Sequence, residues 1–443
     1  MHPLLGAPIL PTLGRLAAPG IVLALFQTAV SVADTYYVGK LGTEALAGLA
    51  LVFPMVMLLQ MSSAGAMGGG VSSAVARARG AGNADAARRL VAHALVIALA
   101  GGGLFTLVLL VFGRGLYGLL GGRDTALQQA LAYSSVLFGG AVSVWLANTL
   151  ASLLRGSGNT LAPALALAGS TLVQIPLSGA LTLGWGPFPA LGISGAALAY
   201  VVSFTLSTLA MAVLVWRGPL RPQREHWRLE ARLFGDILRV GAVSTLSALQ
   251  TVFTAVVLTG FVARFGTAAL AGYGIGVRLE LLQVPIVFAI GQALVVMVGV
   301  HIGGGQPDRA KRIAWTGGGA AMLVCLAIGG TVASFPSLWI HLFSDDPAVF
   351  DVGRQYLWLV APLYPLFGLG MALYFASQGS GQVVRPVLAG TARLVFVVGG
   401  GTLVMHAGGP LWALFAVIAA GLAVFGGLTG LAVHRTRWGR SAP

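Results

Sequence analysis

Twelve apolar stretches of about 20 residues constrain the fold of this chain more than any other feature. One α-helix of that length crosses the hydrocarbon core of a membrane. Of the 443 residues, 57% are hydrophobic and 9% are charged, whereas a soluble domain carries about 25% charged residues. We therefore predict an all-α polytopic membrane protein with twelve transmembrane helices, near 16–38, 47–71, 90–112, 131–153, 161–184, 191–215, 237–262, 273–300, 312–335, 353–376, 386–405 and 411–433.

The lysine and arginine residues divide unequally between the two sides of these spans. When Arg239, Arg312 and Arg354 at the ends of spans are counted with the loops that they adjoin, 19 of the 26 lie on the side of both termini and five on the opposite side, while Arg278 and Arg393 lie inside spans. Basic loops favour the cytoplasm. We therefore predict a multi-pass protein of the inner (plasma) membrane with both termini cytoplasmic. The net charge of +14 then orients helices, and we predict no nucleic-acid partner.

The chain also repeats itself at an offset of 223 or 224 residues. "LGTEALAG" at 41–48 returns as "FGTAALAG" at 265–272, and "RGSGNTLAP" at 155–163 returns as "QGSGQVVRP" at 378–386. A third pair is "AGNADAARR" at 81–89 and "GGQPDRAKR" at 304–312. Because the offset spans six helices, the two halves have the same orientation, as parallel repeats do. The Pro- and Arg-rich segment 216–236 separates them. We predict an N-lobe at 1–215, a cytoplasmic linker at 216–236 and a C-lobe at 237–443.

These stretches resemble the multidrug and toxic compound extrusion (MATE) family of secondary transporters. The resemblance covers nearly the whole chain, from "DTYYVGKLGTEALAG" through the paired basic loops to the paired "GSG" turns. It implies two six-helix lobes around a V-shaped cavity. It also implies export of amphipathic, often cationic small molecules, driven by inward flow of protons or sodium ions. We predict no cofactor beyond that coupling ion, the lipid bilayer as surroundings, and a monomer.

Asp34 is the most informative single residue, because an ionised carboxylate in hydrocarbon is costly and needs a use or a partner. It shares one helical face with Gln27, Ser31 and Val38, and the second repeat has Leu258 at the equivalent place. The MATE resemblance implies that Asp34 is the N-lobe coupling carboxylate, and burial favours its neutral form. The alternative is an Asp that caps the end of its helix.

The chain departs from the family in the rest of that site. Members with an N-lobe coupling site commonly carry Asn-x-x-x-Asp in the fifth span and a Thr in the sixth. The corresponding residues here are Gln174, Ser178 and Tyr200. With the second carboxylate gone, a sodium site is harder to build than a proton site, because sodium favours several oxygen ligands and compensating negative charge. We therefore predict proton coupling in preference to sodium coupling.

The second half offers one intramembrane acid, Glu280. Family members of the other coupling type carry a glutamate where this chain has Gln250 or Thr251, so we predict no coupling through that span. Glu280 remains a secondary candidate with two open interpretations. It serves either a structural ion pair, with Arg278 or Arg393, or a proton or substrate site.

We predict a substrate cavity lined by flexible and aromatic side chains, which suit promiscuous binding. Ordinary packing is the alternative role for each of these residues. The candidates are Tyr37, Met57, Gln60, Met61, Asn148, Gln250 and Tyr364.

Two other functional classes fit the sequence less well. A lipid-linked precursor flippase of the same broad superfamily is expected to line its cavity with several cations, but only Arg278 and Arg393 lie within spans. An intramembrane enzyme would need paired acids or a Ser/His arrangement, which the spans lack. With one cysteine, Cys325, and no P-loop, we predict no metal site, no ATP-driven step and no enzymatic activity.

Overall fold

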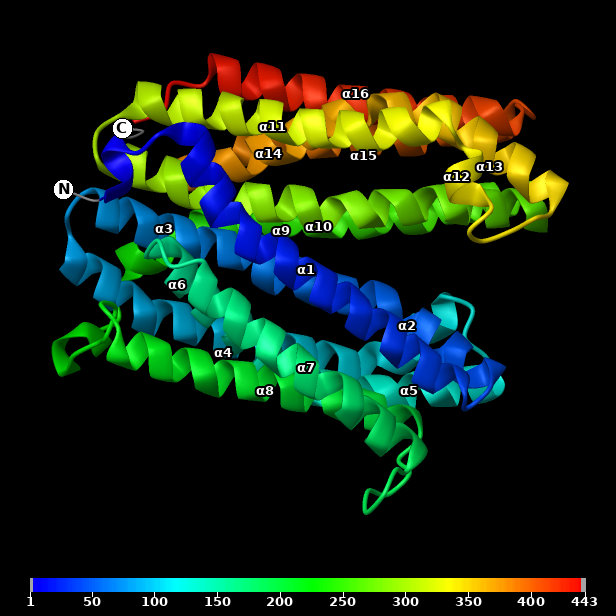
Figure 1. The fold of residues 1–443 in the computed structure, drawn as a ribbon, viewed down its shortest axis with the longest axis horizontal. Coiled ribbons are helices and arrows are strands. Elements are labelled where there is room, and N and C mark those ends of the chain that lie inside the picture. The colour runs from blue at the N-terminus through cyan, green and yellow to red at the C-terminus, as the bar shows by residue number, and fades with distance from the viewer. Residues whose placement is uncertain (1–2, 440–443) are drawn as a thin grey trace. The chain divides into compact units, whose positions relative to one another are not determined.

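The structure is a computed structural model that describes residues 3–439, and within them every regular element is a helix. The predicted cytoplasmic ends of the chain include residues 1–2 and 440–443, which lie outside the described residues. Figure 1 shows the elements in chain order. They are η1 (Pro3–Gly6), α1 (Ile9–Gly39), α2 (Thr43–Gln60), η2 (Met61–Met67), α3 (Gly68–Gly80), α4 (Ala84–Leu119), α5 (Asp124–Gly139), α6 (Ala141–Gly156), α7 (Leu161–Leu183), α8 (Ile193–Arg217), η3 (Arg224–Trp227), α9 (Ala231–Ala263), α10 (Thr267–Gly303), α11 (Pro307–Ser334), α12 (Ser337–Ile340), α13 (Pro347–Val360), η4 (Ala361–Leu363), α14 (Tyr364–Ser380), α15 (Val384–His406) and α16 (Leu411–Arg435).

The number of membrane-spanning helices agrees with the sequence. Among the described residues, 11 helices are long and apolar enough to cross a membrane, or 12 if the bent pair α5 and α6 is one span. The predicted all-α polytopic fold is confirmed. Several helices extend well beyond their predicted ends; α4, for example, runs from Ala84 to Leu119 rather than over 90–112. The apolar stretch marks the hydrocarbon thickness, whereas the helix itself continues to Asn83, whose side chain caps it by accepting a hydrogen bond from the Ala86 amide.

The span predicted as one helix near 131–153 is formed by two helices, α5 and α6, which together are long and apolar enough to cross a membrane. The axes of α5 and α6 meet at 48° around Gly140. A Cβ at Gly140 would lie 2.4 Å from the side chain of Val201 on α8, so only glycine permits this approach of the backbone. The repeat-related span is also interrupted, by the short 3-10 turn η4 with Pro362 between α13 and α14.

The chain forms two compact units. We call Ala18–Ala242 the N unit, and we call the residues up to Ala17 together with those from Val243 on the C unit. The predicted lobe boundaries, 1–215 and 237–443, differ from this division at the first helix of each half. Leu13, Leu16 and Ala17 of α1 belong to the hydrophobic core of the C unit, whereas Ile237 of α9 belongs to the core of the N unit.

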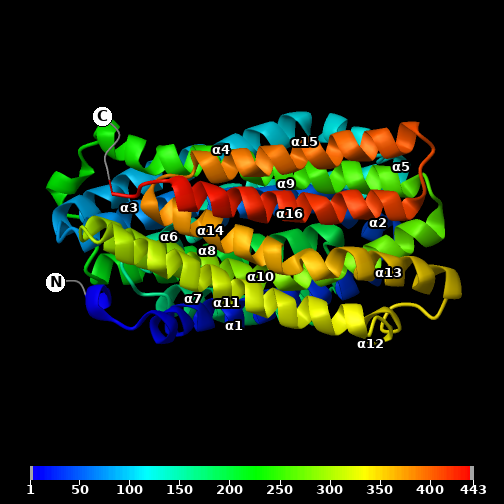
Figure 2. The same ribbon diagram turned by 90° about the horizontal axis from the view of Figure 1, so that it is seen from above.

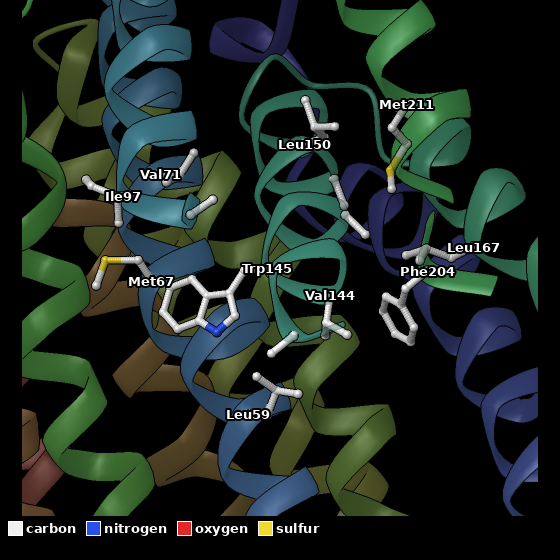
Figure 3. Close-up of a cluster of buried hydrophobic side chains, with 14 of the residues drawn as sticks. Leu59, Met67, Val71, Ile97, Val144, Trp145, Leu150, Leu167, Phe204 and Met211 are labelled. Atoms are coloured by element: carbon white, nitrogen blue, oxygen red, sulfur yellow. The ribbon is translucent and has the colours of Figure 1, made fainter. Parts of the chain in front are cut away.

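Each unit is built around one central helix. In the N unit α6 packs against α3, α4 and α8, and in the C unit α14 packs against α10, α11 and α16. Figure 2 shows α14 among its C-unit neighbours. Figure 3 shows the N-unit core around Trp145 of α6, with Leu59, Met67 and Phe204 among the labelled side chains.

The two "GSG" turns follow these central helices and explain one of the sequence repeats. A Cβ at Gly156 would lie 2.7 Å from the carbonyl oxygen of Ser72, and a Cβ at Gly379 would lie 2.7 Å from that of Val295. The last glycine of each turn, Gly158 or Gly381, has a positive φ of 95° or 79°, which favours glycine. Close backbone contact and a left-handed turn therefore require the same two glycines in both units.

Candidate functional site

Asp34 lies on the part of α1 that belongs to the N unit, and its carboxyl group contacts α7. Gln174 donates a hydrogen bond from Nε2 to Oδ2 of Asp34 at 3.1 Å. The other oxygen, Oδ1, is buried and has no hydrogen-bond partner among residues 3–439. α1 continues past Asp34 to Gly39. The carboxyl group therefore joins two helices and bonds to α7 rather than to the end of its own helix.

Gln174 and Ser178 lie one helical turn apart on α7, on the face that is turned to Asp34. Gln174 is 3% exposed and Ser178 is fully buried. The Ser178 hydroxyl is close enough to act electrostatically on the carboxyl group, although its Oγ has no partner with hydrogen-bond geometry in the described part of the chain. The structure thus brings together three of the four predicted coupling residues.

The fourth, Tyr200 of α8, has its hydrogen bond elsewhere. Its hydroxyl accepts from Nε2 of Gln60 at 2.5 Å, while Asp34 lies within electrostatic range of it. Asn148 of α6 uses Nδ2 to donate to Oε1 of Gln60 at 3.0 Å and to Oγ of Ser63 at 2.8 Å. Gln60 and Asn148, which we predicted as cavity residues, therefore form one polar network with Tyr200.

This network is centred on an irregular turn of the second span. Gln60 ends α2, and η2, which contains Ser63, follows it as a π-helix over Met61–Met67. π-helical turns are rare and often occur at functional sites. The wider turn places the Ser63 hydroxyl beside the Asn148 amide, one turn of helix from the Gln60 amide.

Two polar residues of the N unit, Ser63 and Tyr133, lie near this site and were not among the predicted site residues. Tyr133 of α5 is 6% exposed and lies within electrostatic range of Asp34. The repeat could have indicated Tyr133, because a tyrosine occurs at the matching place in both halves. Tyr133 and Tyr356 are 223 residues apart, and each lies near the intramembrane acid of its own unit.

Three predicted cavity residues lie outside these polar contacts. Tyr37 packs edge-on against Trp185, with ring centroids 5.4 Å apart. Met57 and Met61 are half-buried on the second span. A lining role for these three side chains stays a prediction.

Glu280 of α10 lies among tyrosines of the C unit. The Tyr356 hydroxyl donates a short hydrogen bond to Oε1 of Glu280, and Tyr364 lies close to the same carboxylate. Neither predicted ion pair forms within 4 Å in the described residues. Arg278 is exposed and lies over the ring of Phe343 at 4.9 Å, whereas Arg393 interacts with Glu280 only electrostatically.

The remaining C-unit candidates fall into two groups. Gln250 of α9 donates to Oγ1 of Thr391 at 2.7 Å and has no acid in hydrogen-bond contact among residues 3–439. Tyr364 is 1% exposed and belongs with Glu280. Gln283, one turn after Glu280 on α10, is 1% exposed, and neither atom of its amide has a partner among the described residues.

Known proteins are similar to this chain over most of its length. The MatE family profile matches residues 19–179 and 244–401, which is most of the chain and parts of both repeats. The chain belongs to the MatE family. The predicted resemblance to MATE transporters is thereby confirmed. Because members of this family are membrane transporters, the protein is a transporter and not an enzyme, as predicted.

Individual relatives of this MatE protein are distant but match along nearly their full length. A protein of Shewanella oneidensis named FAD transporter is 26% identical over 400 residues, covering 90% of this chain and 88% of the relative. The probable multidrug resistance protein NorM of Deinococcus radiodurans is 28% identical over 458 residues, covering 97% and 96%. The solved structure of a MOP superfamily transporter from Pyrococcus furiosus is 24% identical with a TM-score of 0.89, covering 97% of this chain and 96% of that one. The last comparison concerns the fold alone.

One cluster of this MatE protein has the composition of a metal site, with Asp85, Glu225 and His226 close together in the N unit. The hydrogen bonds of His226 do not fit a metal ligand. Its Nδ1 accepts from the backbone amide of Gln223 at 2.8 Å, so the ring proton is on Nε2, which lies 2.8 Å from Oδ1 of Asp85. A metal ion needs a free lone pair on the nitrogen that faces it. The cluster is therefore a hydrogen-bonded contact between the linker and α4.

Proposed function

We propose that this MatE protein is a secondary active exporter of amphipathic, mostly cationic small molecules, and that inward proton flow through Asp34 drives it. The single observation that carries the proposal is the Asp34 carboxyl group. It lies within a membrane span, one oxygen is held by an uncharged amide, and the other is buried without a partner in the described residues. A buried carboxyl group without a compensating cation favours the neutral form. Such a group takes up a proton in an apolar state and releases it when water reaches it.

The neighbours of Asp34 support protons over sodium ions as the coupling ion. Sodium requires several oxygen ligands around it. Gln174 presents its amide nitrogen to the carboxyl group, and Ser178 adds one hydroxyl. We propose that Gln174 and Ser178 orient the carboxyl group, and that Tyr200 connects it to the network of Gln60 and Asn148.

The substrate class rests on the relatives. The Deinococcus radiodurans relative is named a probable multidrug resistance protein, and the two intramembrane acids, Asp34 and Glu280, offer negative charge to a cation. Cells that carry this protein should accumulate less of a lipophilic cation dye than cells with an empty vector, and an uncoupler should remove the difference. Equal accumulation over a broad dye panel contradicts multidrug export.

A second candidate substrate is a flavin nucleotide, because the Shewanella oneidensis relative is named a FAD transporter. FAD carries two phosphates, so it calls for cationic rather than acidic contacts. Proteoliposomes loaded with FAD or with a cationic dye separate the two substrate classes directly. Export of FAD with no export of dye would replace the first candidate.

Glu280 is a secondary candidate for coupling or for substrate binding, since its carboxylate contacts tyrosine hydroxyls rather than an arginine. We assign it the smaller role because two tyrosines, Tyr356 and Tyr364, lie at its carboxylate, whereas Asp34 has one oxygen bonded to Gln174 and a second, Oδ1, that is buried without a partner among residues 3–439.

The coupling proposal is tested in proteoliposomes under separately imposed proton and sodium gradients. Wild type should export dye when protons flow inward and should not respond to sodium. Asp34→Asn keeps the size of the side chain and removes its titration, so it should bind substrate and fail to concentrate it. The matched control is Asp345→Asn, whose carboxyl group is 94% exposed. Proton-driven export by the Asp34→Asn variant, normalised to folded protein, would sink the proposal.

We further propose, on the basis of the charge distribution, that the protein lies in the inner (plasma) membrane with cytoplasmic termini; that it is a monomer stays a prediction. Single cysteines in the loops at 81–83 and 304–306 should react with an impermeant reagent only from the cytoplasmic side. The labelling background is Cys325→Ser, although the native thiol is buried. Labelling of either loop from outside reverses the topology.

A further inference from the structure

The linker between the two halves of the sequence is fixed to the start of α4 by polar contacts. Arg89 forms an ion pair with Glu230 at 2.6 Å. His93, which is fully buried, accepts a hydrogen bond at Nε2 from the Glu230 amide and bonds through Nδ1 to the Arg89 carbonyl. Four residues before Glu230, His226 bonds to Asp85. The linker therefore has a defined position on the N unit.

Because its inner side is anchored, the linker turns a defined set of residues outward. Leu220 and His226 are buried. Trp227 is 48% exposed and Leu229 is 55% exposed. Large apolar side chains usually gain by leaving water, so a rigid segment that holds two of them outward indicates a binding surface.

The same segment carries an excess of positive charge. Five exposed arginines lie in or next to this segment, and among the described residues none of the five takes part in an ion pair or a side-chain hydrogen bond. Among the nearby acids, Glu230 is paired with Arg89, Asp85 is bonded to His226, and Glu225 lies 3.8 Å from His226 with its side chain 67% exposed. Five arginines against one exposed acid without an arginine partner leave the segment with a net positive charge. The predicted linker at 216–236 is helical at both ends, and the five arginines are Arg217 at the end of α8, Arg221, Arg224 and Arg228 between α8 and α9, and Arg232 in the first turn of α9.

The position of the linker along the chain determines which partner this surface meets. The linker begins where the spanning helix α8 ends, at Arg217, and Trp216 at that end is 39% exposed. Tryptophan favours the headgroup level of a bilayer, and arginine near an anionic leaflet is attracted to it. A rigid surface with both residue types, at the end of a span, matches the headgroups of anionic phospholipids.

We propose that the linker face formed by Trp227, Leu229 and the five arginines binds anionic phospholipid headgroups, with the two indole rings at the interface. This surface, which we call the lipid-binding face, is independent of the coupling site. The hydrogen bonds of His93 and His226 fix the position of this face relative to the end of α8.

Hydrogen exchange in nanodiscs tests the proposal with pure lipids. The full-length protein is placed in phosphatidylcholine alone or in phosphatidylcholine with phosphatidylglycerol, and exchange is followed in a peptide covering 224–232. Each arginine near an anionic surface should raise the equilibrium constant for binding of this segment to the lipid surface by about fivefold at low salt. We expect clearly slower exchange with phosphatidylglycerol, and high salt should weaken the effect.

A charge-matched pair of variants separates this face from general surface charge. Arg224→Gln with Arg228→Gln should remove the phosphatidylglycerol effect, whereas Arg114→Gln with Arg123→Gln, at two exposed arginines elsewhere in the N unit, should preserve it. Trp227→Ser should reduce protection in both lipids. Equal exchange in the two lipid compositions, or an unchanged effect in the Arg224 and Arg228 variant, would overturn the proposal. Protection that appears only when a soluble protein is added would assign the face to that partner.

Discussion

Gln60 and Gln283 occupy matching places in the two repeats, 223 residues apart, yet they have opposite surroundings. In the N unit Gln60 links Tyr200 and Asn148. In the C unit neither atom of the Gln283 amide has a partner among residues 3–439. The offset places Met371 where the N unit has Asn148, and Ala423 where it has Tyr200. The second repeat therefore has the glutamine at this place without the polar partners that it has in the first.

The intramembrane acids differ in a related way. Asp34 comes from α1 and meets an amide, whereas Glu280 comes from α10 and meets a tyrosine hydroxyl. The matching tyrosines, Tyr133 and Tyr356, are present in both units. Each unit therefore brings a carboxyl group near the same tyrosine position from a different helix, so one backbone frame carries two unlike acidic sites.

The largest expected difference between the two units is in the export rate after each intramembrane acid is neutralised. Asp34→Asn should lower gradient-driven export by about tenfold or more, because it removes the titrating group of the span. Glu280→Gln should lower it by a few-fold at most. Both rates are measured in proteoliposomes per folded molecule. A larger loss in the Glu280→Gln variant would move the coupling role to the C unit.

The central helices should respond alike, because their backbone contacts match. Gly156→Ala and Gly379→Ala each place a Cβ 2.7 Å from a backbone oxygen, so each should destabilise the fold by about 1–3 kcal/mol. Gly169→Ala is the control, since its Cβ has no neighbour within 4 Å. Thermal unfolding midpoints in detergent measure all three. Unequal decreases in the unfolding midpoint for Gly156→Ala and Gly379→Ala would show that the two repeats differ in backbone packing as well as in their polar residues.

Replacing the two matched glutamines should affect stability differently. Gln60→Met leaves Tyr200 and Asn148 without a shared partner and should destabilise the protein by about 1–2 kcal/mol. Gln283→Met replaces an unpaired amide by an apolar side chain of similar size, so the effect should be neutral or slightly stabilising. The same unfolding assay applies. Marked destabilisation by Gln283→Met would mean that the amide binds a group of its own, such as an ordered water or an ion.

The smallest expected effect is the difference in stability between variants of the two matching tyrosines, Tyr356 and Tyr133. Tyr356→Phe removes the donor to Glu280 and should destabilise the protein by about 1 kcal/mol. Tyr133 makes no hydrogen bond to Asp34 in the described chain, so Tyr133→Phe should have a smaller effect. Equal midpoints for the two variants would indicate that the Tyr356 contact adds little to stability.

Local features of the sequence determined much of this protein. Hydrophobic stretches predicted the spans because burial in lipid depends on each segment separately. The "GSG" repeat marked its turns because close approach and a positive φ are local demands on glycine. The MATE resemblance placed Asp34, Gln174 and Ser178 in one group, and the structure brings these three residues together, while their role in coupling stays a prediction.

Only the tertiary structure decided which distant side chains meet. Tyr200 bonds to Gln60 rather than to Asp34, and Tyr364 adjoins Glu280, because helix rotation and the π-helical turn at Met61–Met67 set the directions of side chains from separate helices. The break at Gly140 depends on Val201, a residue of another span. The start of α1 packs in the C unit because its leucines fit the core there. Hydropathy acts along one helix at a time, whereas these contacts are formed between helices, and a single sequence contains no direct record of them.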